Sequence, residues 1–247
     1  MLVATFVLVF LIGRSISPRM EKFDLLILEL FTLFPALIFI RFQGLPITKI
    51  FRLHPVSGGV IFFSVLVGLS TTILTDEVDR LVSLAFPMPE GIRAELLNKL
   101  QINTPGDFAI IFSASVLVAP LVEEMLFRGF LQNALEHRGD VTRAVMGTAA
   151  AFAIFHFNPW WLIQILILGT VLGVMAWAAN SLLPGIIVHG INNGLALFLF
   201  SVPEGGLTWY QWKGHVSPWL LGLSLVVLIV AGVRFWRACR PWPAESA

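Results

Sequence analysis

Two adjacent acids and an arginine stand inside a strongly apolar stretch, in the segment PLVEEMLFRGF at residues 120–130. A charged side chain in hydrocarbon costs roughly 2.5–3.5 kcal/mol on insertion scales, so it needs a partner or a function. Arg128 follows Glu124 by one helical turn, so the two can pair on one helix face. Glu123 points about 100° away from Glu124 and has no such partner in its own helix. This contrast predicts chemistry at Glu123.

Two further polar clusters interrupt apolar stretches later in the chain. His156 ends one stretch in the run FAIFHFN, and His189 and Asn193 begin another in the run HGINN. His189 and Asn193 are four residues apart, so both can face one side of a helix and bind one oxygen atom. Glu123 and His156 lie on either side of a turn at residues 139–140 and are equally far from it in sequence. If both helices run unbroken to that turn, a rise of ~1.5 Å per residue places the two side chains at the same depth in the membrane. We therefore expect these four residues to meet.

Residues of these types suit the hydrolysis of an amide bond by an activated water. A carboxylate held away from bulk water is a competent general base near neutrality, and we assign this role to Glu123. His156 would hold the same water. His189 and Asn193 would donate hydrogen bonds to the oxyanion, where loss of one donor typically slows the reaction ~100–1000-fold. The three clusters contain no serine or cysteine, which argues against a covalent intermediate.

A zinc-dependent site is the alternative that the same residues leave open. Glu123, His156 and His189 could supply three zinc ligands, with water as the fourth. The helical HExxH pair of many zinc proteases is absent, and we prefer a site with no metal and no cofactor. Glu124 and Arg128 are predicted to be a supporting ion pair that shapes the site.

The composition predicts a membrane protein. Of the 247 residues, 57% are hydrophobic and 13% are charged, whereas about a quarter of the residues are charged in a soluble domain. The net charge of +1 gives no indication of nucleic-acid binding. The lone Cys239 excludes an intrachain disulfide and a cysteine metal cage.

Eight apolar stretches predict an all-α, polytopic membrane fold of about eight transmembrane helices around an intramembrane polar site. They lie near residues 1–13, 23–42, 57–74, 108–130, 142–157, 160–179, 183–201 and 217–236. A spanning helix needs ~20 residues, so the first and fifth stretches are short. The polar segment between the third and fourth is expected to hold two short interfacial helices, at 75–80 and 91–101.

Three parts of one membrane domain follow from this pattern. Residues 1–107 hold the N-terminal transmembrane helices and the polar connecting segment, and residues 108–201 hold the catalytic helices. Residues 202–247 hold an aromatic loop, the last transmembrane helix and a basic tail. The Lys and Arg residues of the connections favour a cytoplasmic position for both chain ends.

The three polar clusters together resemble a known family signature. The blocks EExxxR at 123–128, FxxxH at 152–156 and HxxxN at 189–193 are similar to the motifs of the CPBP intramembrane proteases. That family includes the CAAX prenyl endopeptidases of eukaryotes and the Abi proteins of bacteria, and its members are often called metalloproteases. The resemblance implies an eight-helix fold and peptide-bond hydrolysis within or near the membrane, without implying a prenylated substrate.

The expected protein is a multi-pass protease of the bacterial cytoplasmic (inner) membrane. Its expected partners are a peptide or membrane-protein substrate and the lipid bilayer, with no nucleic acid. Two other classes remain as alternatives, a non-catalytic immunity or scaffold protein and a proton-coupled transporter. Buried Glu, His and Arg side chains also mark proton relays, but the internal repeats of many transporters are absent.

Overall fold

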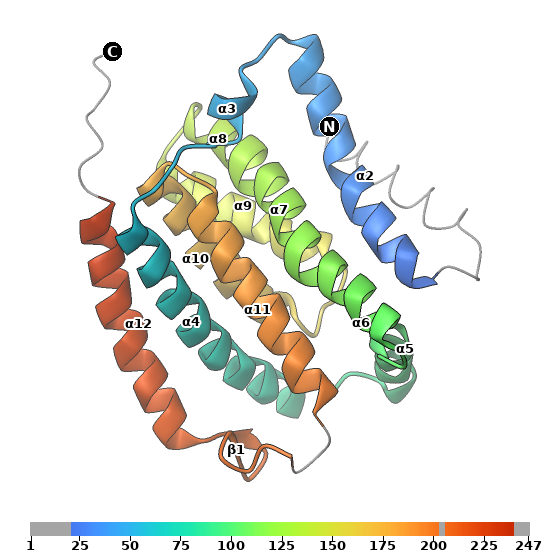
Figure 1. Ribbon diagram of the computed structural model, residues 1–247. Helices are drawn as coiled ribbons and strands as arrows, with labels where there is room; N and C mark the ends of the chain where they lie inside the picture. Colours follow the sequence, from blue (N-terminus) through green and yellow to red (C-terminus); the bar gives the residue numbers. More distant parts are fainter. Residues whose placement is uncertain (1–20, 203–205, 240–247) are drawn as a thin grey trace.

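One long helix, from Pro105 to Glu136, forms the centre of the protein (Figure 1). The computed structural model describes residues 21–202 and 206–239. The central helix consists of α6 (Pro105–Phe112), α7 (Ala119–Glu124) and α8 (Asn133–Glu136), which are joined by two π-helical sections, η2 (Ser113–Val118) and η3 (Met125–Gln132). It begins with a capping box, because the Thr104 hydroxyl accepts the Asp107 backbone N–H and the Asp107 carboxylate accepts the Thr104 N–H.

The helices of residues 21–42, 141–155, 162–179 and 183–201 pack against the central helix, and those of residues 58–85 and 218–238 lie outside them. The elements are α2 (Glu21–Phe42), α3 (Ile47–Ile50), α4 (Gly58–Ala85), α5 (Glu90–Leu100), α9 (Val141–Phe155), α10 (Leu162–Ala179), α11 (Leu183–Ser201) and α12 (Pro218–Ala238), with a hairpin of strands β1 (Gln211–Trp212) and β2 (His215–Val216). α2 lies along one side of the central helix, while α4 packs against α10, α11 and α12. α9 and α10 form an antiparallel hairpin.

Five helices of the described residues are long and apolar enough to cross a membrane. They are Gly58–Ala85, Pro105–Glu136, Leu162–Ala179, Leu183–Ser201 and Pro218–Ala238. Only 22% of the apolar window of α12 is buried within the protein, so most of its side chains face outward, where lipid would cover them. These helices confirm a mostly helical, integral membrane protein.

The predicted count of about eight spans is not confirmed. The stretch at 142–157 forms α9, which has 15 residues and is too short to cross a bilayer unaided. The stretch at 23–42 forms α2, which is not among the five candidates, and the stretch at 1–13 lies outside the described residues.

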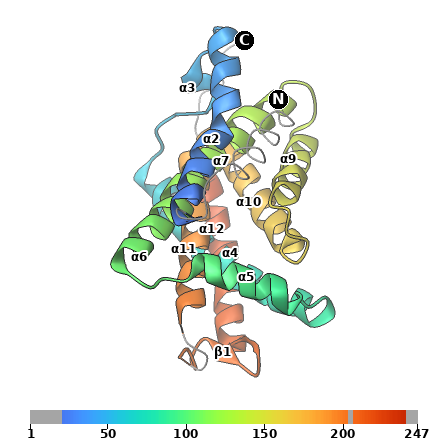
Figure 2. The ribbon, with the colours of Figure 1, turned by 90° about the vertical axis from the view of Figure 1, so that its right-hand side faces the viewer.

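One predicted boundary is wrong. α4 continues to Ala85, well beyond the end predicted at residue 74, so the separate interfacial helix predicted at 75–80 does not form. The helix predicted at 91–101 does form, as α5. Figure 2 shows α5 lying crosswise to the long helices, below the tip of the α9–α10 hairpin and above the β-hairpin.

The β-hairpin explains why α4 tolerates acids in its last turns. The Tyr210 hydroxyl donates to Asp76 Oδ2 at 2.8 Å, and the Val216 backbone N–H donates to Glu77 Oε2 at 2.8 Å. Burial, together with the Asp76 charge, raises the pKa of the Tyr210 hydroxyl, so it remains a donor. Because these partners satisfy the carboxylates, the helix continues through a polar segment.

A row of polar side chains fixes the central helix against α10. Arg128 Nη2 donates to the Gly169 carbonyl at 3.0 Å, and one turn later Gln132 Nε2 donates to the Gly173 carbonyl at 2.9 Å. A Cβ atom on Gly173 would lie 2.9 Å from Gln132 Oε1, so this close approach requires glycine. The carbonyls of Gly169 and Gly173, which have GxxxG spacing, therefore accept hydrogen bonds from buried donors of the central helix.

Candidate active site

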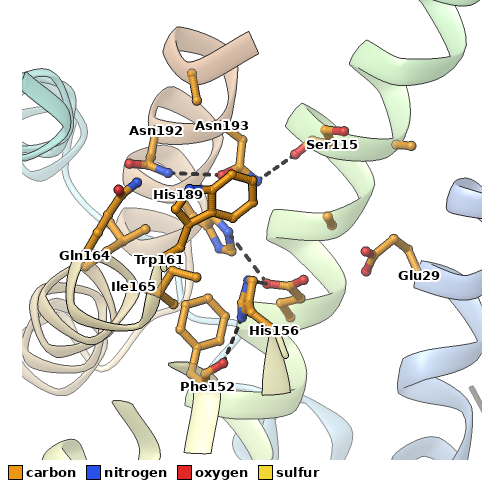
Figure 3. A pocket seen from close by; sticks show the side chains of 15 residues that line it. Glu29, Ser115, Phe152, His156, Trp161, Gln164, Ile165, His189, Asn192 and Asn193 are labelled. Atoms are coloured by element: carbon orange, nitrogen blue, oxygen red, sulfur yellow. Dashed lines mark hydrogen bonds and ion pairs between the residues drawn. The ribbon is translucent and has the colours of Figure 1, made fainter. Parts of the chain in front are cut away.

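A cavity of about 310 Å³ lies between α2, the central helix, α10, α11 and the end of α9 (Figure 3). Its lining residues are Glu29, Ala114, Ser115, Ala119, Glu123, Phe152, His156, Trp161, Gln164, Ile165, Leu168, His189, Asn192, Asn193 and Ala196. Its volume is at the lower end of the range for ligand pockets. The four residues that the sequence predicts to meet, Glu123, His156, His189 and Asn193, all line it.

The Glu123 carboxylate lies at the point where the two histidines converge. Glu123 Oε2 is buried and has no hydrogen bond among the described residues. His189 Nε2 lies 3.7 Å from this oxygen, and His156 Nε2 lies 4.0 Å from it. These distances are too long for direct hydrogen bonds but suit one bridging water. The predicted proximity of Glu123 and His156 is confirmed.

The contact made by Nδ1 of each histidine determines which ring nitrogen carries the proton. His156 Nδ1 lies 2.8 Å from the Phe152 carbonyl oxygen, which can only accept, so Nδ1 carries a proton. His189 Nδ1 lies 3.1 Å from Glu124 Oε1, and it donates to that carboxylate. In each neutral ring Nε2 is therefore an acceptor that faces Glu123. A water molecule has two hydrogens, so it can donate to Glu123 Oε2 and to one of the two Nε2 atoms.

The Glu124–Arg128 pair forms as predicted and also supports the site. Arg128 Nη1 donates to Glu124 Oε1 at 2.8 Å, both side chains are fully buried, and the guanidinium carbon lies 4.3 Å from the Phe152 ring centre. The same Glu124 oxygen accepts from His189, a contact that helical spacing alone does not indicate. A Cβ atom on Gly185 would lie 2.7 Å from Glu124 Oε2, so only glycine leaves room for this carboxylate.

Asn193 is held by two contacts. Its Nδ2 donates to the Ser115 carbonyl in the π-helical section at 2.9 Å, and its Oδ1 accepts from Asn192 Nδ2 at 3.2 Å (Figure 3). These contacts fix the orientation of the amide and leave its second amide hydrogen for a ligand. Asn192 also lines the cavity, and its hydrogen bond positions Asn193.

The sequence motifs do not identify four of the polar lining residues, one of which is Ser115 of the π-helical section η2. Glu29 comes from α2, Gln164 from α10, and Trp161 from the turn before α10. Glu29, like Glu123, is an acid inside an apolar helix, and this feature is visible in the sequence. Gln164 and Trp161 carry no such signal, because an amide or an indole in this setting is compatible with ordinary packing.

The side chains do not fit a zinc site as they are arranged. Within residues 21–202 and 206–239, no group of three or more His, Cys, Asp or Glu side chains is placed to hold a metal ion.

The fold and the site define a helical membrane protein with a buried Glu/His/Asn cavity beside its central helix. Residues 105–195 match a family model described as type II CAAX prenyl endopeptidase Rce1-like. The match covers all three motifs and confirms the predicted resemblance to the CPBP/CAAX protease family. No curated protein and no solved structure matches the chain. The family match supports a membrane protease.

Proposed function

We propose that this protein is an intramembrane endopeptidase that cuts a peptide bond of a membrane-associated protein or peptide. The observation that carries the proposal is the convergence of His156 Nε2 and His189 Nε2 on Glu123 Oε2 within one cavity. The family match over residues 105–195 supports the same class of reaction.

The first step of the proposed reaction is the activation of water. One water would donate one hydrogen to Glu123 Oε2 and the other to His156 Nε2, which leaves an oxygen lone pair free to attack the peptide carbonyl carbon. Glu123 takes the proton as the new C–O bond forms, and then delivers it to the departing amine. Phe152 supports this geometry, because its carbonyl keeps the proton of His156 on Nδ1.

His189 and Asn193 would stabilise the negative charge that develops on the carbonyl oxygen. Asn193 offers its second amide hydrogen, and His189 offers an Nε2–H when its ring is doubly protonated. Glu124 accepts the Nδ1 hydrogen bond in both protonation states of His189, so it holds the ring in place. Glu123 and His189 are buried, and hydrogen bonds to the oxyanion are stronger in such a setting than in water.

The site also constrains the substrate. Glu123 lies near the middle of a 32-residue helix that is apolar enough to span the membrane, so the bond that is cut must reach bilayer depth. A hydrophobic or lipid-modified peptide can do this. The test panel therefore includes a prenylated CAAX reporter, small lipoproteins and short secreted peptides.

The test compares wild-type protein with Glu123→Gln after co-expression with this panel, and new peptide termini are identified by mass spectrometry. We expect cleavage by the wild type and none by Glu123→Gln, which removes the base but keeps the shape of the side chain. Glu90→Gln removes an exposed acid at the start of α5 and should cleave normally. Full activity in Glu123→Gln would refute the proposed role of this carboxylate.

A further inference from the structure

A second carboxyl group faces the active-site cavity from α2. Figure 3 shows Glu29 projecting from this helix toward the cavity, across from the side that carries His156 and His189. Glu29 makes no hydrogen bond or ion pair with any residue of the described ranges. An acid without such a partner in an apolar helix indicates a function that the fold alone does not explain.

The cavity contains acids but no cation among its described lining residues. Its ionisable lining side chains are Glu29, Glu123 and the two histidines, and its other polar groups are the hydroxyl of Ser115, the indole of Trp161 and the amides of three residues. Arg128 does not line the cavity. Its guanidinium is bonded to Glu124 and to the Gly169 carbonyl.

Two carboxyl groups in one cavity disfavour one another when both are ionised, because burial weakens the screening of their charges. Glu123 is 9% exposed, and its Oε2 has no hydrogen bond among the described residues. A cation that enters with the substrate would balance the charge of Glu29 and leave Glu123 free to act as the base. The charge of the cavity therefore favours a positively charged guest over a neutral or acidic one.

We propose that Glu29 determines specificity by binding a lysine or arginine side chain of the substrate, close to the bond that is cut. This inference rests on the proposed protease function and adds a class of substrate to it. The three sequence motifs lie on the central helix, α9 and α11, so α2 contributes a contact that is separate from the catalytic groups.

The test uses the full-length protein in lipid nanodiscs and a panel of palmitoylated Leu/Ala peptides. Each peptide carries one lysine, norleucine or glutamate, moved along the sequence one position at a time. Binding is measured by photo-crosslinking and cleavage by mass spectrometry. At one position, we expect the wild type to prefer lysine over norleucine roughly 10- to 100-fold, the range expected for a hydrogen bond between charged groups.

The variants identify the source of that preference. Glu29→Gln should bring the lysine-to-norleucine ratio close to one, and Glu29→Lys should reverse the preference toward glutamate. The control Glu90→Gln removes the same charge from an exposed position and should retain the wild-type ratio. Because Glu29→Gln keeps the shape of the side chain, it carries the test even where Glu29→Lys fails to fold.

Two results would overturn the inference. One is a lysine preference that persists in Glu29→Gln, and the other is an equal loss on all peptides, which would mean that Glu29 acts in the chemistry or the fold. Cleavage by the wild type with no lysine preference would refute this inference alone. A Glu29-dependent binding preference without cleavage of any substrate would support the inference and refute the protease function.

Discussion

The Glu124→Gln substitution tests whether the buried ion pair supports both the fold and the site. Glutamine keeps the size of the side chain but removes the charge that balances Arg128. The two groups lie 2.8 Å apart with no solvent exposure, so Arg128 would remain as a buried cation without its counter-charge. Arg128 would keep its hydrogen bond to Gly169 and its contact with the Phe152 ring.

Breaking a buried pair from one side typically costs ~3–5 kcal/mol. The two remaining Arg128 contacts place our expectation near the lower end, at about 3 kcal/mol, a large part of the ~5–15 kcal/mol stability of a typical protein. On the scale of soluble domains, this loss lowers the melting temperature by on the order of 10 °C. We therefore expect a clear fall in folded yield.

The assay compares thermal unfolding and monodisperse yield in detergent with a matched pair on α5. Glu95 and Lys99 have the same spacing and the same 2.8 Å separation, but their side chains are 68% and 55% exposed. Water screens this exposed pair, so Glu95→Gln should leave the melting temperature unchanged. If Glu124→Gln is as stable as the wild type, or if Glu95→Gln loses as much, the burial argument is wrong.

A double substitution separates stability from activity. Glu124→Leu combined with Arg128→Met leaves no unpaired charge and should recover much of the stability that Glu124→Gln loses. It should remain inactive, because His189 Nδ1 has lost its acceptor. Recovery of activity along with stability would show that Glu124 does not position His189.

The remaining predictions concern the oxyanion and the metal. Asn193→Ala should bind peptide normally but turn it over ~100-fold or more slowly, because the oxyanion exists only in the transition state; steady-state kcat and KM measure this. Asn193→Asp should be slower still, because its charge opposes the oxyanion, and Asn192→Ala should lose less, because it only positions Asn193. A large rise in KM for Asn193→Ala would place this amide in substrate binding instead. Proteolytic activity should survive a strong chelator, and elemental analysis of the purified protein should find no stoichiometric zinc. Activity that is lost on chelation and recovered on added zinc would make His156 and His189 zinc ligands.

Local spacing in the sequence determined several features of this protein. The apolar composition indicated a membrane protein, and the four-residue spacing of Glu124 and Arg128 predicted their ion pair. Glu123 and His156 are equally far, in residues, from the turn at 139–140, and this predicted that they would meet. These predictions succeeded because helical periodicity and rise are properties of the chain segment itself.

Other features depended on contacts between segments far apart in the sequence. α4 continues past residue 74 because the β-hairpin, more than 130 residues later, satisfies Asp76 and Glu77. The bond from His189 to Glu124 depends on how α11 is rotated against the central helix. Two π-helical sections change the phase of that helix, so a regular 3.6-residue repeat does not fix all of its faces.

Glu29 shows most clearly what the sequence alone does not determine. Its sequence setting marks an acid in an apolar helix, but it does not say whether that acid faces lipid, a neighbouring helix or a cavity. Only the packing of α2 along the central helix places it beside Glu123, because the direction of a side chain depends on the neighbours that its helix finds. The sequence determined which groups could do chemistry, and the tertiary structure decided which of them share one cavity.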